Sequence, residues 1–200
     1  MDNFDQKREE IKNVSRKIFA AYGFSKTLLE DIAGAVGIKK NSLYYYFDSK
    51  EALFKELIND EAAEYFEKQR KIIETDALAD KKMLKCISEL MYFIHERSTK
   101  YSITRKAYLE IKSNLEKYHQ NFRQRQLEIF EKILKQGIES DLFHKHNTKN
   151  FAADIILIVQ SIELNFYINS NVQFLHEVDF DLVSKTINRI INYMLNGIKK

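Results

Sequence analysis

Hydrophobic residues recur every three or four positions along most of this chain, and that spacing predicts α-helices. In a first helix, expected over residues 4–22, the apolar side chains share one face: Ile11, Val14, Ile18, Phe19 and Tyr22. A second helix is expected to begin at Leu28, because Thr27 and Glu30 have the spacing of an N-terminal capping box. A short third helix is expected over residues 39–46, with Leu43 and Phe47 pointing inward.

The helical spacing continues in longer segments. Asp48 and Glu51 repeat the capping-box spacing and open a fourth helix, about residues 49–72. Further helices are expected over residues 78–97, 101–113, 115–140, 148–169 and 180–198. We therefore expect an all-α fold of about nine helices. A three-helix domain should occupy residues 1–48 and a helical domain residues 49–200, with the fourth helix connecting them.

Composition supports this fold class and indicates the cellular compartment. The 200 residues include no proline and five glycines, and 44% are hydrophobic, which excludes both a turn-rich β-sandwich and a disordered chain. Cys86 is the single cysteine, so a disulfide framework is impossible and a reducing compartment is expected. The polar N-terminus does not read as a signal peptide, and no apolar run reaches about 18 residues. We expect a cytoplasmic protein that does not span a membrane.

The second and third predicted helices have the plan of a helix-turn-helix. Ala33 is small where the two helices would cross, Gly37 supplies the turn, and Leu43 and Phe47 anchor the second helix. The opposite face carries hydrogen-bonding and aromatic side chains: Lys40, Asn41, Ser42, Tyr44, Tyr45 and Tyr46. A helix with such a face can enter a major groove and contact base edges.

Residues 11–54 resemble the DNA-binding domain of the TetR (tetracycline-repressor-like, TetR/AcrR) family of bacterial transcriptional regulators. The matching stretches are Ile11 to Phe19, Tyr22-Gly-Phe24, Thr27 to Ala33, Val36-Gly-Ile38 and Ser42 to Leu53. The remainder matches the family in length and helical layout. The resemblance implies a dimeric, ligand-responsive repressor that binds a near-palindromic double-stranded DNA operator.

The resemblance also implies roles for single residues. Base contacts fall to Lys40, Asn41, Ser42 and Tyr44, and phosphate contacts to Thr27, Lys39, Tyr45, Tyr46 and Lys50. Lys39, Asn41 and Tyr46 depart from the Ser, Gly and His that are frequent in the family, so operator identity does not carry over. Three simpler roles stay open: Tyr44 and Tyr45 as covers of the core, Lys39 and Lys40 as a solvated face, and Lys50 as a helix-start side chain.

The resemblance implies that the C-terminal domain dimerises and binds a small molecule. The segment 148–169 is apolar all round, as expected for a helix that is covered on more than one side. The expected dimer interface is Ile155, Val159, Ile162, Val183, Ile187, Ile190, Ile191 and Met194. The expected pocket residues for an unknown effector are Tyr92, His95, Tyr108, Tyr118, Phe122, Gln160, Glu163 and Phe166.

Charge leaves the nature of the effector open. Residues 97–136 contain ten basic and four acidic residues. This excess is explained either by an exposed helix face or by attraction of an anionic ligand such as an acyl-CoA.

The alternatives to a DNA-binding regulator are a helical metal-carboxylate enzyme and a helical interaction module that does not bind DNA. A helical di-metal carboxylate enzyme would need two Glu-x-x-His motifs, and Glu116-Lys-Tyr-His119 is a single match. His144 and His146 lie in a short link and read as a solvated loop. A helical interaction module without DNA binding would not need the polar face described above. We therefore expect no enzyme activity, no metal and no cofactor.

Overall fold

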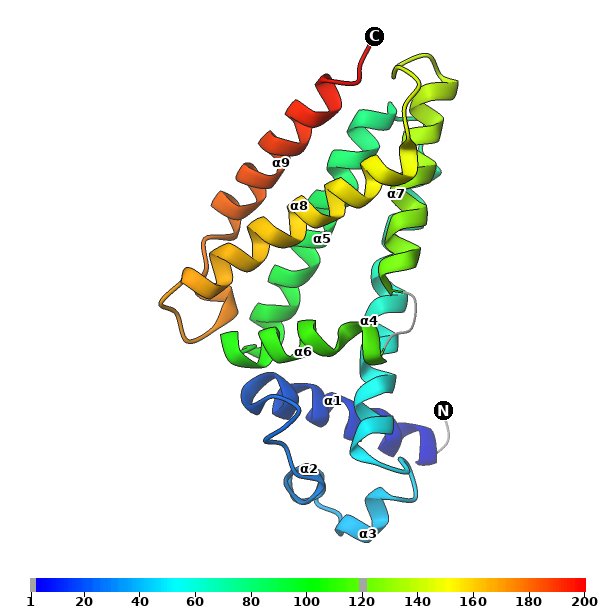
Figure 1. Ribbon diagram of the computed structural model, residues 1–200. Helices are drawn as coiled ribbons and strands as arrows, with labels where there is room; N and C mark the ends of the chain where they lie inside the picture. Colours follow the sequence, from blue (N-terminus) through cyan, green and yellow to red (C-terminus); the bar gives the residue numbers. More distant parts are fainter. Residues whose placement is uncertain (1–2, 119–121) are drawn as a thin grey trace. The chain divides into compact units, whose positions relative to one another are not determined.

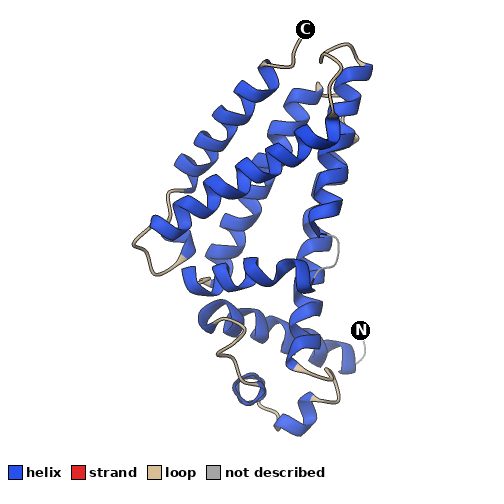
Figure 2. Cartoon of the chain, viewed as in Figure 1, coloured by secondary structure: helices blue, strands red, loops and turns tan. Residues whose placement is uncertain are grey.

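The computed structural model describes residues 3–118 and 122–200, with the side chains of residues 114–118 outside the description. In this part of the chain it contains nine α-helices and a short 3-10 helix, Leu175–Glu177 (Figures 1 and 2). The α-helices are α1 (Asn3–Tyr22), α2 (Leu29–Val36), α3 (Lys40–Leu43), α4 (Lys50–Ile73), α5 (Ala79–Tyr101), α6 (Arg105–Tyr118), α7 (Phe122–Glu139), α8 (Thr148–Asn169) and α9 (Phe180–Asn196). The all-α prediction with about nine helices is confirmed.

Several predicted helix boundaries are wrong. The third helix is α-helical only over Lys40–Leu43, and residues 44–46 form a turn. The sixth helix starts at Arg105, because α5 runs to Tyr101 and Ser102 then takes a positive φ of 50°. It continues to Tyr118, so residues 115–118 belong to α6 and not to the next helix. This stretch has no Gly or Pro, so the sequence offered no local signal for the break.

The chain divides into two compact units. The first contains residues 1–62, 97–120 and 172–177, and the second contains residues 63–96, 121–171 and 178–200. This division differs from the boundary expected between residues 48 and 49. The first unit includes α6 because Thr104 donates a backbone hydrogen bond to the carbonyl of Ala20 at 3.0 Å. The Glu110 side chain also accepts one from the amide of Ser25 at 2.8 Å.

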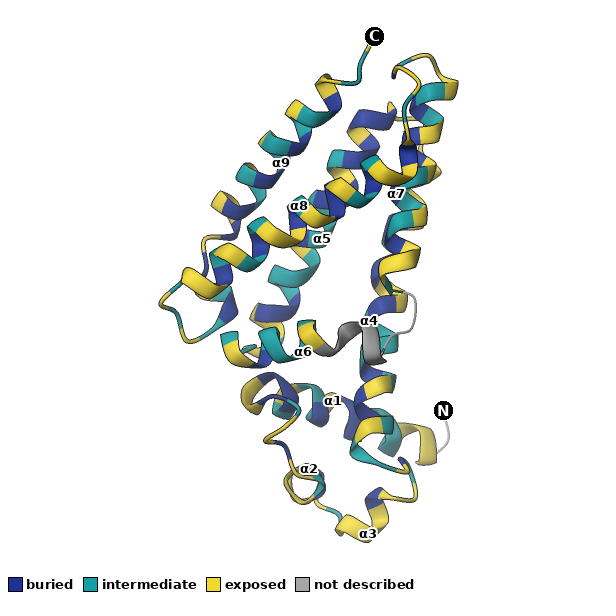
Figure 3. Cartoon of the chain, viewed as in Figure 1, coloured by how far each residue is buried: buried dark blue, intermediate teal, exposed yellow. Residues whose placement is uncertain are grey.

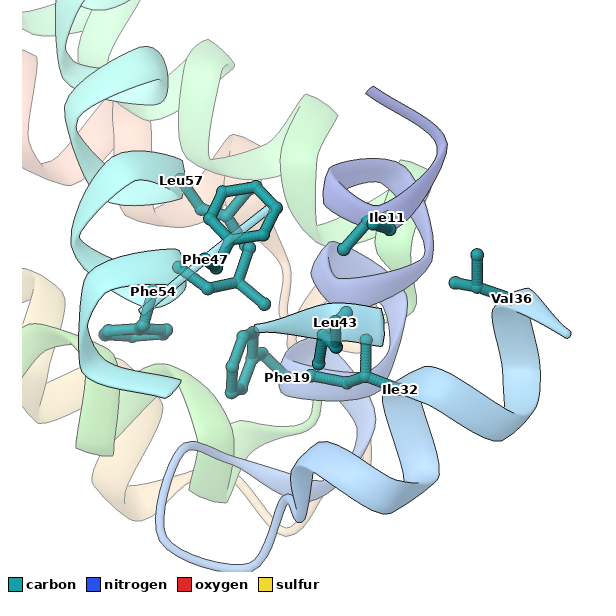
Figure 4. Packing of buried hydrophobic residues seen from close by; sticks show 9 residues of the cluster. Ile11, Phe19, Ile32, Val36, Leu43, Phe47, Phe54 and Leu57 are labelled. Carbon is teal, nitrogen blue, oxygen red and sulfur yellow. The ribbon is translucent and has the colours of Figure 1, made fainter. Parts of the chain in front are cut away.

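The first unit has a single apolar core between α1, α2, α3 and the start of α4. Figure 4 shows its side chains gathered there, from Ile11 and Phe19 of α1 to Phe54 and Leu57 of α4. Leu43 of α3 is fully buried in this core, and Phe47 is nearly so. The two residues that the sequence assigned as anchors therefore hold α3 to the rest of the unit.

A ladder of ion pairs joins α1 to α4 beside this core. Arg8, Lys12 and Arg16 follow one another at four-residue spacing on α1, and each pairs with carboxylates of α4. The distances are 2.5 Å from Arg8 to Glu56, 2.6 Å from Lys12 to Asp60, and 3.0 Å from Arg16 to both Asp60 and Glu61. Arg97 of α5 extends the ladder to Glu61 at 2.5 Å.

Lys12 is the most buried member of the ladder, with 6% of its surface exposed. Burial alone lowers the pKa of its ammonium group, but hydrogen bonds to Asp60, Glu9 and Glu56 outweigh that effect and raise the pKa. Burial alone likewise raises the pKa of Glu56, and the bonds from Arg8 and Lys12 lower it. Both charges are therefore stabilised in the folded protein.

In the second unit α8 packs against α7 and α9. Its core includes Ile155 and Val159 of α8, together with Ile187 of α9. Figure 3 shows buried and exposed faces alternating along these helices. Gly137 of α7 permits a close approach here, because a Cβ at this position would lie 2.1 Å from the buried ring of Phe143. The glycine is therefore required for packing.

An 18-residue window within helix α8 has the length and mean hydropathy, 1.5, of a membrane-crossing helix by composition, although Glu163 interrupts the apolar run. The same test is met by core helices of soluble proteins. In that window 33% of the residues are buried within the chain, and the exposed large apolar side chains of α8 are Leu157 and Ile168. These two side chains are where another surface would cover the helix.

Candidate nucleic-acid interface

The turn between α2 and α3 depends on Gly37. This residue has φ 74° and ψ 31°, the left-handed conformation that ends many helices. The amide of the next residue, Ile38, then bonds to the carbonyl of Ala33 at 2.9 Å. No atom lies within 4 Å of a Cβ placed on Gly37, so its backbone conformation, and not space, favours glycine there.

The start of α2 differs from the predicted capping box. Leu28 is the N-cap, and its amide donates to the carboxylate of Asp31 at 3.1 Å. Thr27 is fully buried and its hydroxyl donates to the carbonyl of Gly23 at 2.7 Å. The phosphate role expected of the Thr27 side chain therefore does not fit the structure, since its hydroxyl is already used inside the core.

Helix α3 presents an exposed face made of the residues expected to contact DNA. Its exposed members include Lys39, Lys40, Asn41 and Ser42. Tyr44 is 44% exposed and Tyr45 is 74% exposed. The surface colouring of α3 in Figure 3 agrees with this arrangement. All four candidate base-contacting residues thus lie on or beside one short, outward-facing helix, and Tyr44 does not cover the core.

Lys40 has a partner that the sequence did not reveal. The ammonium of Lys40 lies 2.6 Å from the carboxylate of Glu30 on α2, and both groups are exposed. Their hydrogen bond raises the pKa of Lys40 and lowers that of Glu30. Lys39 is the N-cap of α3 and makes no side-chain cap bond, as its replacement of the usual serine predicts.

Lys50 has a structural role that the sequence did not predict, and its phosphate contact stays a prediction. Its ammonium donates to the carbonyls of Phe24 at 2.9 Å and Thr27 at 3.0 Å, and it lies 4.4 Å from the centroid of the Phe24 ring. It therefore fixes the loop before α2. An ammonium has three donors, so one N–H remains for a phosphate. The cap of α4 is Ser49, whose hydroxyl accepts from the amide of Ala52 at 3.0 Å, and not Asp48 as predicted.

The first turn of α1 contacts this region and was missed by the sequence reading. The ring of Phe4 stacks on Tyr46 with centroids 4.9 Å apart and meets Tyr45 edge-on at 5.3 Å. Lys7 donates to the carbonyl of Val36, at the end of α2, at 3.1 Å. Tyr46 is partly buried against the core, so its ring has a packing role. Residues 4 and 7 share a helix face, and that spacing was the one available signal.

The pocket candidates are dispersed. Glu163 is buried, and its charge contributes to raising the pKa values of both Tyr65 and Tyr167. The Phe122 ring stacks on Tyr65 at 5.8 Å, and His95 lies 4.6 Å from Phe180. These candidates belong to the interior of the second unit. The other candidates do not lie in this interior. Tyr92 and Gln160 are exposed, and Phe166 is half-buried. Tyr108 belongs to the first unit, and the side chain of Tyr118 is outside the described residues.

The dimer candidates divide into two groups. Five are buried within their own unit and cannot contact a second copy: Ile155, Val159, Val183, Ile187 and Ile191. Ile162, Ile190 and Met194 are half-buried. The exposed apolar side chains of α8 and α9 are instead Leu157, Ile168, Leu182 and Tyr193. Periodicity identified apolar positions correctly, but it did not distinguish the internal face from the outer one.

Known proteins are similar to this chain either over its N-terminal part or over nearly its whole length. Residues 11–57 match the family model described as bacterial regulatory proteins, tetR family. The transcriptional repressor KstR2 of Rhodococcus jostii is 37% identical over 67 residues, which is 34% of this chain and 33% of KstR2. The transcriptional regulator QacR of Staphylococcus aureus is 25% identical over 96% of this chain and 98% of its own length.

A solved structure shares the whole fold. The transcriptional regulator from Cytophaga hutchinsonii is 26% identical, with a TM-score of 0.78 over 96% of this chain and 98% of its own. The match to KstR2 spans only a third of that protein, whereas QacR and the solved structure match at full length. Residues 11–57 therefore match the tetR family of bacterial regulatory proteins, and over nearly its whole length the chain is similar to transcriptional regulators.

Proposed function

We propose that the protein is a cytoplasmic repressor that binds a near-palindromic DNA operator as a homodimer and releases it when a small molecule binds the second unit. The exposed face of α3 carries this proposal. Lys40, Asn41, Ser42 and Tyr44 offer donors and acceptors to base edges. We assign the phosphate contacts to Lys39 and Tyr45, which are exposed, and to Lys50, which is half-buried.

DNA binding is tested by fluorescence anisotropy with the DNA upstream of the protein's own gene. We expect sequence-selective binding that weakens steeply as salt rises. Asn41→Ala should reduce selectivity, whereas Lys39→Ala should weaken binding to all sequences and reduce the salt slope by about one. Binding that is independent of both sequence and salt would refute the proposal.

A homodimer is supported by the outer faces of α8 and α9. Leu157 and Ile168 of α8 are 57% and 53% exposed, and Tyr193 of α9 is 66% exposed. A dimer should place its two recognition helices about 34–36 Å apart, or a multiple of that, to reach successive major grooves. Leu157→Glu should weaken the dimer at least tenfold in sedimentation velocity. The matched control Leu78→Glu, at a side chain that is also 57% exposed, should leave it intact.

An effector site is supported by incompletely bonded polar groups inside the second unit. Gln69 donates to the carbonyl of Cys86 at 3.0 Å, and Gln126 accepts from the hydroxyl of Tyr65. The remaining amide atoms, Oε1 of Gln69 and Nε2 of Gln126, are buried and have no hydrogen-bond partner among the described residues. Unpartnered buried polar atoms are costly, and a ligand with both an acceptor and a donor would satisfy them.

The surroundings of these amides favour an uncharged aromatic or aliphatic effector. Burial raises the pKa of Cys86 to about 12 and that of Tyr65 well above its usual value, so both groups stay neutral. The Glu163 charge nearby disfavours an anion. Most basic residues of the 97–136 segment, including Arg123, Arg125 and Lys135, are exposed. They fit a solvated helix face better than an acyl-CoA site.

A thermal-shift screen tests the effector site with matched compounds of one hydrocarbon body and either an amide or a carboxylate head group. The amide should raise the melting temperature and release the DNA, since a ligand of the native state stabilises it. Gln69→Met should abolish the shift without reducing DNA binding. A shift with the carboxylate alone, or an unchanged response in Gln69→Met, would overturn the assignment of these amides.

A further inference from the structure

Helix α3 is too short to fix its own position. It spans four residues, and its N-cap side chain makes no hydrogen bond. A single helical turn is unstable in isolation because nucleation is unfavourable. Its inward anchors, Leu43 and Phe47, hold one side only. The turn that follows, residues 44–46, carries Tyr44 and Tyr45 at the exposed surface and needs support of its own.

That support comes from the first turn of α1. The Phe4 ring stacks on Tyr46 with an interplanar angle of 20° and meets Tyr45 edge-on at 89°. Tyr45 and Tyr46 also meet edge-on, with centroids 5.4 Å apart. The three rings therefore form a closed triangle in which each ring touches the other two. Stacked and edge-on pairs at these distances are the favourable aromatic geometries.

Lys7 provides a second contact one helical turn along the same face. Its ammonium donates to the carbonyl of Val36 at 3.1 Å and pairs with Glu10 at 2.9 Å. Val36 is the last residue of α2, so this bond holds the beginning of the turn that leads into α3. Phe4 and Lys7 together hold the segment on both sides of α3.

We propose that Phe4 is a positioning residue for DNA recognition: it acts through Tyr45 and Tyr46 to set the orientation of the α3 segment, without touching DNA itself. This role rests on the proposed DNA binding. Tyr45 is 74% exposed, and its ring contacts those of Phe4 and Tyr46, so Phe4 is a contact from outside the α3 segment that restrains the Tyr45 ring. A fixed Tyr45 reaches the DNA backbone without losing side-chain freedom on binding.

The first experiment is a double-mutant cycle on operator affinity. Phe4→Ala should weaken operator binding about tenfold through loss of two aromatic pairs, and Phe4→Tyr should restore it. If Phe4 acts through Tyr45 and Tyr46, adding Phe4→Ala to the variant Tyr45→Ala/Tyr46→Ala should weaken binding no further. The control Tyr22→Ala removes a ring that is 62% exposed at the other end of α1 and should leave affinity unchanged. Additive losses in the cycle would show that Phe4 contacts DNA directly and overturn the proposal.

The second experiment needs no DNA. The amides of Tyr46 and Phe47 both bond to the carbonyl of Leu43 at 3.0 Å. Phe4→Ala should speed their hydrogen exchange about tenfold, while amides in the middle of α4 keep their protection. Unchanged exchange at residues 45–47 would overturn the positioning role. If exchange changes but the wild-type protein binds no operator, the proposed function fails and the ring contact stands.

Discussion

The two units handle buried polar groups in different ways. In the first unit the buried Lys12 ammonium contacts carboxylates of Glu9, Glu56 and Asp60, and the buried Thr27 hydroxyl bonds to a carbonyl. In the second unit buried amide atoms of Gln69 and Gln126 have no partner among the described residues, and α8 leaves Leu157 and Ile168 exposed. The first unit satisfies Lys12 and Thr27 by its own contacts, and Nδ1 of His176 is the one buried side-chain atom there without a hydrogen-bond partner among the described residues. The second has groups that a ligand and a second copy would complete.

The largest effect is expected where the second unit is packed most tightly. Gly137→Ala places a methyl group 2.1 Å from the buried Phe143 ring and 3.0 Å from Ala79, which should destabilise the protein by about 3 kcal/mol. In the first unit Gly34→Ala meets nothing within 4 Å and should stabilise α2 by about 0.5–1 kcal/mol. Urea denaturation measures both. Equal effects of the two substitutions would show that helix propensity alone decides the outcome.

The sequence predicts a structural feature of either unit when the residues that determine the feature lie close together in the chain. The bounds of α8 were predicted as 148–169 and are confirmed, because Asn147 caps the helix by accepting from the amide of Asn150 at 3.0 Å. Two other contacts are between residues of separate elements: Phe143 packs closely on Gly137, and the Phe4 ring contacts Tyr45. Periodicity carries no information about such partners.

For the proposed DNA-contacting and dimer surfaces, too, the sequence predicts what one helix determines and not what its neighbours determine. The exposed face of α3 followed from the two anchors, Leu43 and Phe47, because a four-residue helix with buried anchors must expose the rest. The pairing of Lys40 with Glu30 depends on how α2 lies beside α3. The internal placement of Ile187 depends on which neighbours cover α9. Neither can be read from the spacing of residues along one helix.

The ion-pair ladder of the first unit should give the second-largest effect. Lys12→Ala leaves carboxylates of Glu56 and Asp60 with one cation fewer, although Arg8 and Arg16 still pair with them. We expect a loss of about 2 kcal/mol in the free energy of unfolding. Lys17→Ala, at an exposed position of the same helix, is the control and should change stability by less than about 0.5 kcal/mol. A similar small loss in both variants would mean that the ladder is not a stabilising feature.

The same ladder predicts sensitivity to acid. The folded pKa of Glu56 is lowered, so its contribution is present above its unfolded pKa, about 4.3. That contribution is lost as pH falls through the depressed folded value. Unfolding free energy measured between pH 7 and pH 3 should fall less steeply in Glu56→Gln than in the wild-type protein, by about 1 kcal/mol over the range. Parallel curves for the two proteins would exclude Glu56 from the acid response. The raised pKa of Lys12 acts at the other end, since its contribution is lost only as pH rises through that value.

The smallest effect is expected on operator affinity, from the solvent-exposed ion pair between Glu30 and Lys40 in the first unit. Glu30 engages the Lys40 ammonium at 2.6 Å, and a carboxylate beside the α3 face also repels phosphates. Glu30→Gln should therefore raise operator affinity about twofold to fivefold, and the gain should shrink as salt increases. Glu139→Gln removes an exposed carboxylate from α7 in the second unit and controls for net charge. If both variants gain equally, long-range charge is the cause. If Glu30→Gln loses affinity instead, the Glu30–Lys40 pair acts on DNA as a unit, with the carboxylate orienting the ammonium toward its base.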